Sequence, residues 1–155
     1  MLPVLFVGHG SPMIALEKSE LTENFRKIGE EIVSKQRPEG ILSISAHWFR
    51  TSNRVQSSLN PEQVYDMSGF PKELYQVKYQ PEGNRALTDE VTNILGDKVL
   101  IDDSWGIDHG TWSVLVHMFP KADIPVVQLN VNMIADFPEM YNLGQQLSEL
   151  RNKYL

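Results

Sequence analysis

Short apolar runs alternate with longer segments in which apolar residues recur every three or four positions. The first run, residues 2–7, is continuously apolar and ends at Gly8, which predicts a strand buried on both faces. Period-two or apolar patterns predict further strands at residues 41–46, 55–59, 74–79, 99–101 and 125–131.

Helices are predicted where apolar residues repeat at helical spacing. The earlier ones are expected over residues 21–32, 87–95 and 112–119. Gly96 stands where a C-cap belongs, and Asp136 precedes the last helix with Glu139 in capping-box position. The buried side of that last helix is expected to consist of Phe137, Met140, Gly144, Leu147 and Leu150.

The order of these elements predicts a single α/β domain over residues 1–155. We expect three layers, αβα, with a mostly parallel sheet and helices on both of its faces. In a doubly wound fold, a helix of this polarity is usually followed by another strand. We therefore expect that a C-terminal part is missing, and that its absence leaves apolar residues of the sheet in contact with water.

Composition narrows the function classes. The chain carries 14 basic and 20 acidic residues, a net charge of -6, which argues against nucleic acid or an anionic membrane as partner. There is no cysteine, so thiolate nucleophiles and thiolate metal sites are excluded. No apolar run is long enough to span a bilayer, and the N-terminus lacks the features of a signal peptide. A cytoplasmic location is therefore expected.

Three of the four histidines follow predicted strands, where ligands bind in open α/β sheets. His9 stands between Gly8 and Gly10, which we expect to allow a close approach to a ligand, and His47 follows the second strand. Because neutral imidazole is the commonest metal ligand, His9 and His47 are predicted to bind a metal ion together. For His109, three roles stay open: a third ligand, an acid–base group or a substrate contact.

Other signatures are weak or absent. Neither a nucleophile elbow nor a Walker motif is found, and Met13 occupies the position where a dinucleotide fingerprint needs its last glycine. His117 lies off the apolar face of its helix, which indicates a structural or surface role. Trp48, Trp105 and Trp112 each neighbour a histidine loop and belong either to the core or to the wall of an aromatic pocket.

These motifs together resemble those of a known family. They are VGHGSPM at residues 7–13, SAHW at 45–48, YDMSGFP at 65–71, LY at 74–75 and DHGTW at 108–112. In this order they resemble the class III extradiol ring-cleavage dioxygenases of the LigB superfamily, in particular the DOPA 4,5-dioxygenase-like branch. The set spans most of the chain and is far more specific than any one of its members.

The resemblance implies a non-haem metal site, with Fe(II) as the catalytic ion and Zn(II) as a plausible occupant. His9 and His47 match the first two ligands of the family. His109 matches an active-site histidine with a catalytic or substrate-contacting role. The implied substrates are a DOPA-like catechol and O2. The family's remaining ligand and a further catalytic histidine come from a C-terminal part for which no motif stands here. Self-association, or pairing with that missing segment, is therefore expected, and the activity of the 155 residues alone stays open.

Two alternatives from other classes remain at this stage. A metal-dependent hydrolase of the same architecture would use His9 and His47 to hold zinc for the attack of water on an amide or ester. An inactive metal-binding fragment would bind the ion weakly through two histidines. Oxygen-dependent turnover of a catechol separates the first alternative from the dioxygenase, and metal analysis of the purified protein separates the second.

Overall fold

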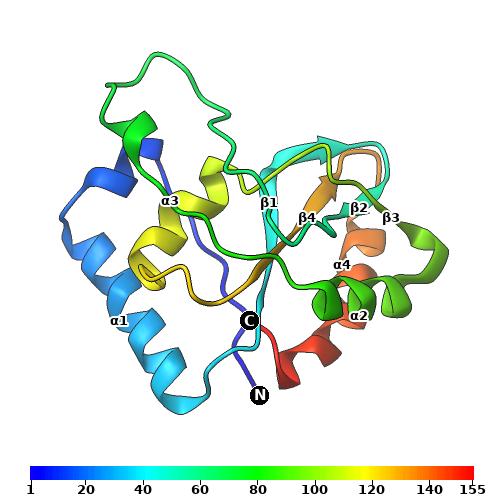
Figure 1. Ribbon diagram of the computed structural model, residues 1–155. Helices are drawn as coiled ribbons and strands as arrows, with labels where there is room; N and C mark the ends of the chain where they lie inside the picture. Colours follow the sequence, from blue (N-terminus) through cyan, green and yellow to red (C-terminus); the bar gives the residue numbers. More distant parts are fainter.

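The protein, described here by a computed structural model of residues 1–155, is a four-stranded sheet between two layers of helices (Figure 1). The strands lie in the order β1 (Ile41–Arg50), β4 (Val126–Asn132), β2 (Asn53–Val55) and β3 (Val99–Ile101). β1 runs parallel to β4, and β2 runs parallel to β3. The contact between β2 and β4 is antiparallel, through Val55 and Leu129. The predicted α/β class is confirmed, with a mixed sheet.

Each face of the sheet is covered by two helices. α1 (Glu20–Lys35) and α3 (His109–Met118) lie on one side, while α2 (Arg85–Leu95) and α4 (Phe137–Leu147) lie on the other (Figure 1). Short 3-10 helices connect the larger elements: η1 (Pro12–Leu16), η2 (Leu74–Gln76), η3 (Gly96–Lys98) and η4 (Ser148–Asn152).

The apolar core is divided by the sheet into two clusters. On the α1–α3 side, Phe25 and Trp112 pack against Val126. On the other side, Leu87 of α2 packs in a cluster with Val127. Val126 and Val127 are consecutive, so they point to opposite faces of the sheet, and a run buried on both faces results.

Local signals predicted several helix ends correctly. Gly96 follows α2 with φ +58°, a backbone conformation that glycine adopts readily. At the start of α4, the Asp136 carboxylate accepts a hydrogen bond from the Glu139 N–H, and the Glu139 side chain accepts one from the Asp136 N–H. Both signals act within one helical turn, so they do not depend on the rest of the fold.

The prediction of a strand at residues 2–7 is wrong. The segment is extended, but residues 3–10 make no backbone–backbone hydrogen bond, and only the Leu2 N–H pairs, with Arg151 O at 2.7 Å. Val4 is 75% exposed and the Phe6 side chain is fully exposed. An apolar run becomes a strand only when another strand lies beside it, and none does here.

The prediction of a strand at residues 74–79 is also wrong. Residues 74–76 form η2, and the following residues pair with a side chain instead of a strand. The Gln63 amide donates to Val77 O and accepts from the Tyr79 N–H, at 3.1 and 2.9 Å. This amide satisfies the backbone groups that a neighbouring strand would otherwise have paired.

The expected buried side of the last helix is only partly right. Leu147 and Leu150 are buried, but Phe137 is 86% exposed and Met140 is 38% exposed. The helical spacing of the apolar residues was therefore predicted correctly, whereas the number of them that are buried was not. Across the whole molecule, none of the helices has the length and apolar character required to cross a membrane.

Candidate metal centre

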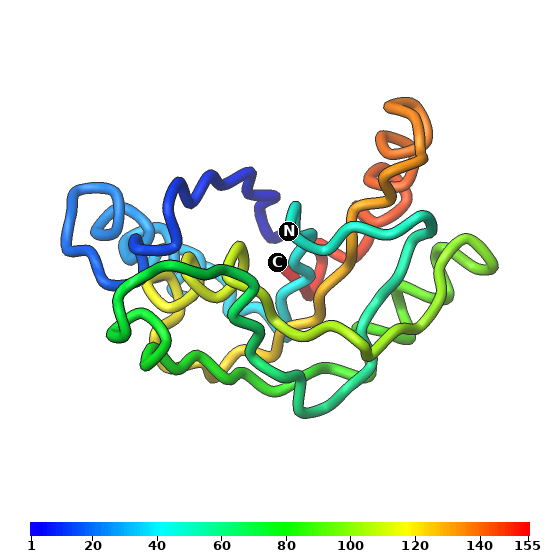
Figure 2. Tube along the Cα trace, turned by 90° about the horizontal axis from the view of Figure 1, so that it is seen from above, coloured from blue at the N-terminus to red at the C-terminus, as the bar shows by residue number.

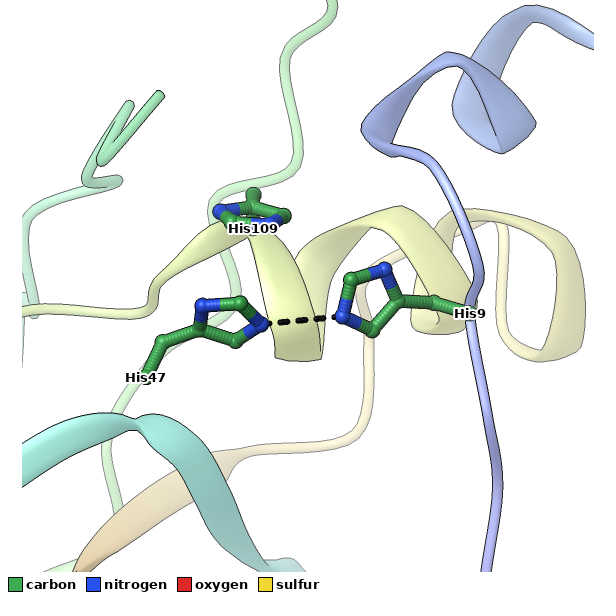
Figure 3. Close-up of side chains that lie close together, drawn as sticks. All are labelled: His9, His47 and His109. Atoms are coloured by element: carbon green, nitrogen blue, oxygen red, sulfur yellow. Dashed lines mark hydrogen bonds between the residues drawn. The ribbon is translucent and has the colours of Figure 1, made fainter.

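Three histidine side chains converge between the N-terminal segment, β1 and the start of α3 (Figure 3). Each offers one ring nitrogen, and these nitrogens all lie within 4.8 Å of one another. His9 Nε2 and His47 Nε2 are 2.9 Å apart, and the ring centroids of His47 and His109 are 4.0 Å apart. The predicted convergence of His9 and His47 is therefore present, and His109 joins them.

His47 owes its direction to an irregularity in β1. The prediction placed it just beyond the strand, but it lies within β1, where the register against β4 shifts between Ser45 and Phe49. Extra residues at such a shift re-aim the side chains. Ser45 Oγ accepts a hydrogen bond from the His47 N–H at 3.1 Å, which fixes the backbone at this point.

His109 is the first residue of α3, although the sequence suggested a loop. Asp108, its N-cap, makes no side-chain capping hydrogen bond. Its fully buried carboxylate instead accepts hydrogen bonds from Ser45 Oγ, Trp105 Nε1 and the Gln128 amide. Asp108 therefore ties α3 to β1 and β4 and holds the backbone from which His109 projects.

Asp66 is a carboxylate beside the cluster that sequence reasoning did not single out. Its Oδ1 accepts the His109 backbone N–H at 2.9 Å and lies 2.9 Å from His109 Nδ1, while its Oδ2 lies 3.6 Å from His47 Nδ1. A carboxylate behind the Nδ1 atoms leaves the Nε2 atoms for a metal or a substrate, which is the usual arrangement at metal-binding histidines. The only sequence signal that pointed to Asp66 was its place in the motif at residues 65–71.

The electrostatics of the cluster favour neutral His9 and ionised Asp66. Burial lowers the pKa of His9, and the neighbouring His109 and His47 lower it further. Burial alone would raise the pKa of Asp66, but its contacts with the side chain and backbone of His109 outweigh that effect and hold this pKa below its usual value. A neutral imidazole is the form that binds a metal ion.

A close approach between two parts of the protein itself occurs at Gly110, while the approach of a ligand to Gly8 and Gly10 stays a prediction. A Cβ at Gly8 or Gly10 would meet no atom within 4 Å, whereas a Cβ at Gly110 would lie 2.5 Å from His47 Cδ2. Real Cβ atoms do not come so close to another carbon atom, so only glycine at position 110 leaves room for the His47 ring. Gly110 is thus the glycine that permits the histidines to converge.

Comparison with known proteins places this geometry in a family. Residues 3–155 match the family model described as the catalytic LigB subunit of aromatic ring-opening dioxygenase. The chain belongs to the LigB family.

Individual relatives agree. The chain is 38% identical to a 4,5-DOPA dioxygenase extradiol of Escherichia coli K12 over 98% of its own length and 56% of the relative's. It is 37% identical to one of Beta vulgaris, covering 96% of this chain and 57% of the relative. A crystal structure of an uncharacterized E. coli K12 protein superimposes with a TM-score of 0.72 at 30% identity, over 89% of this chain and 51% of that one. The chain thus spans a little more than half the length of the curated relatives it matches.

LigB-family enzymes depend on a non-haem metal, and the histidine cluster fits such an ion. Two ligands at about 2.0–2.1 Å from an ion, in adjacent octahedral positions, lie about 2.9 Å apart. The two Nε2 atoms of His9 and His47 have this separation.

The other residues singled out from the sequence have structural roles in this LigB-family chain. A ring nitrogen of His117 lies 2.8 Å from Ile14 O and links α3 to η1, away from the cluster. Ser11 caps η1. Trp48 and Trp112 are fully buried, and Trp105 donates its Nε1–H to Asp108. Trp48 and Trp112 thus belong to the core, whereas Trp105 is only partly buried, and its place in the wall of an aromatic pocket stays a prediction.

Proposed function

We propose that this chain carries the metal-binding half of an extradiol dioxygenase that opens the ring of a DOPA-like catechol with O2. The observation that carries the proposal is the convergence of His9, His47 and His109 in a LigB-family chain. The names of the E. coli and Beta vulgaris relatives support DOPA as the type of substrate.

In this proposal His9 and His47 hold the ion, Fe(II) in the active enzyme and Zn(II) as an alternative occupant. The bound ion supplies the coordination positions at which the two catechol oxygens and O2 are brought together. The Asp66 carboxylate lies on the Nδ1 side of His47, at 3.6 Å, and this negative charge favours a proton on Nδ1 and leaves Nε2 as the ligating atom. The remaining protein ligand is expected from a segment outside these residues.

His109 is proposed to be the residue that moves a proton at the catechol hydroxyl or contacts the substrate. Its Nδ1 atom faces Asp66 Oδ1, so its Nε2 atom is the one available to the substrate. The backbone N–H also bonds to Asp66, which fixes the ring relative to the cluster. Distance alone would allow all three histidines to bind one ion, so the separate role of His109 needs its own test.

Metal titration of the 155-residue chain provides that test. Zn(II) and anaerobic Fe(II) binding would be measured by calorimetry for the wild type and for H9A, H47A, H109A and H117A. We expect binding to be lost in H9A and H47A and retained in H109A. His117→Ala is the matched control because its imidazole lies outside the cluster. Equal losses in H109A and H47A would make His109 a ligand, and unchanged binding in H9A would refute the site.

Catalysis would be tested in a fusion of this chain with the part of the E. coli relative that it does not match. Oxygen uptake with L-DOPA and Fe(II) is expected in the fusion and is expected to disappear on chelation of the metal. H109A in the same fusion should bind the metal and lose about 10²–10⁴-fold in turnover if it transfers protons. If the fusion instead hydrolysed an amide or ester without taking up oxygen, the proposed dioxygenase activity would be wrong and a hydrolase activity would be supported.

A further inference from the structure

β1 is an edge strand with an open side. Its only neighbour in the sheet is β4, so the backbone groups on the opposite side have no strand beside them over most of its length. At the start of β1, however, Tyr154 forms a parallel bridge with Gly40. The Leu155 N–H donates to Gly40 O at 3.0 Å, and the Leu42 N–H donates to Leu155 O at 2.7 Å.

These contacts set a direction and a register on the open edge. The Leu42 N–H points away from β4, so by alternation the Ile44 N–H points the same way. A strand in line with Tyr154 and Leu155 would run parallel to β1 and pair next with Ile44. Ile44 is 54% exposed, which is unusual for an apolar residue in the middle of a sheet strand.

The N-terminal segment, residues 3–8, forms the other wall of this open space. It leads to His9, whose side chain points toward His47 of β1, so that the two imidazoles meet end to end between the two backbones (Figure 3). Adjacent strands lie about 4.8 Å apart, which leaves no room for two side chains arranged in this way. The segment is therefore too far from β1 to be its neighbour, and it carries the exposed Val4 and Phe6.

The N-terminal segment and α4 both carry exposed apolar residues. In Figure 2 the N-terminal segment and α4 rise on the same side, and the two ends of the chain lie next to each other. Apolar side chains are exposed on these two elements, on β1 and on the loop before α4: Val4, Phe6, Ile44, Met133, Ile134, Phe137 and Tyr141. Exposed apolar residues that gather into a patch commonly mark a binding site for another polypeptide.

We propose that the space between the open edge of β1 and residues 3–8 is a docking slot for one further β-strand, parallel to β1. The occupant is a strand from a polypeptide equivalent to the second half of the relatives, because this chain spans only 56–57% of their length. The strand pairs with β1 from Ile44 onward and brings apolar side chains onto Ile44 and Phe6. It thereby also turns residues 2–7 into a paired segment.

The slot would be tested by binding, without any turnover. The chain would be co-expressed with the unmatched part of the E. coli relative, and complex formation would be measured by tagged co-purification and analytical ultracentrifugation. We expect a one-to-one complex in which the Ile44 amide hydrogen becomes protected from exchange. The proposal would be overturned if the separate chains formed no complex and the Ile44 amide also stayed unprotected in their fusion.

Two proline substitutions separate this slot from a general surface effect. Ile44→Pro removes an N–H on the open side of β1 and leaves the bonds to β4 intact, because edge strands tolerate proline on the solvent side. Ile101→Pro is the matched control on β3, the opposite edge of the sheet. Ile101 is 50% exposed, and the alternation set by the bond from the Asp102 N–H to Val55 O directs its N–H away from β2.

Loss of the complex is expected in I44P and not in I101P, and circular dichroism would check that both variants fold. Ile44→Asp, which keeps the N–H but places a charge on the apolar surface, should also weaken the complex and serves if the proline variant fails to fold. Equal binding by all variants would overturn the proposal. The proposal would also be overturned if the wild type formed a homodimer that excludes the added half and that I44P disrupts. A second copy of this chain would then occupy the slot.

Discussion

Helices α3 and α4 have ten and eleven residues, and each follows an aspartate, yet their surroundings differ completely. Seven residues of α3 are buried, against only Leu147 in α4. Asp136 caps its own helix, whereas Asp108 leaves its helix uncapped and accepts hydrogen bonds from β1, β4 and Trp105 instead.

The difference in burial between α3 and α4 corresponds to a difference in their proposed roles. α3 is buried over most of its length, and this burial holds His109 and Gly110 in place beside His47. α4 keeps its apolar residues in water on the side that also bears the open edge of β1. A site needs rigid surroundings, while a docking surface needs accessible apolar area.

The largest expected effect contrasts the two helices directly. Trp112→Ala removes a fully buried ring of α3 whose Nε1–H donates to Val64 O, and should lower the free energy of unfolding by about 3–5 kcal/mol. Phe137→Ala in α4 should change it by no more than about 0.5 kcal/mol, because Phe137 is exposed. Urea denaturation of both variants measures the contrast. Similar losses in the two would mean that α4 is as well packed as α3.

A methyl group added to α3 tests how tightly the helix meets β1. Gly110→Ala should improve helix propensity but force the His47 ring aside, at a net cost of about 1–3 kcal/mol. Gly8→Ala is the matched control, since nothing lies within 4 Å of a Cβ there. Denaturation and the histidine ring signals in NMR spectra measure the two variants. If G110A were as stable as the wild type, with unshifted His47 signals, the close contact would be refuted.

Asp66 contacts two of the three histidines that are proposed to form the metal site. Asp66→Asn should lower the affinity for Zn(II) by about 10–100-fold, because the carboxylate no longer orients His47 and His109. Asp102→Asn is the control. Burial raises the pKa of the Asp102 carboxyl, but its contacts with Ser104 and Arg54 outweigh that effect and lower the pKa, as at Asp66, and neither partner is a histidine. A larger loss of affinity in D102N than in D66N would contradict the positioning role.

The smallest effect on stability is expected from substitutions of the exposed residues of α4. Phe137→Ser combined with Tyr141→Ser should change the free energy of unfolding by about 0.5 kcal/mol or less for each site. The same double variant should associate less at high concentration, because it removes exposed apolar area. Sedimentation velocity over a concentration series measures this. A strongly destabilised variant would show that these side chains are packed within the chain.

Elements with strong local signals were predictable from the sequence. α2 ends at Gly96, α4 begins with its capping box, and β4 is the apolar run expected from residue 125 onward. These features depend on residues within one turn or one strand. The family and the meeting of His9 and His47 also followed from short motifs, because each motif keeps its chemistry within a few consecutive residues, whereas the role of His109 was left open.

Tertiary structure decided what depends on distant partners. Residues 2–7 and 74–79 have strand-like patterns but no strand beside them, and a strand is stable only when another one pairs with it. Asp66 lies 43 residues before His109, and the crowding at Gly110 arises from a ring on β1. Sequence thus determined which residues could bind a metal, while contacts between remote segments determined which carboxylate supports them and which apolar residues stay exposed.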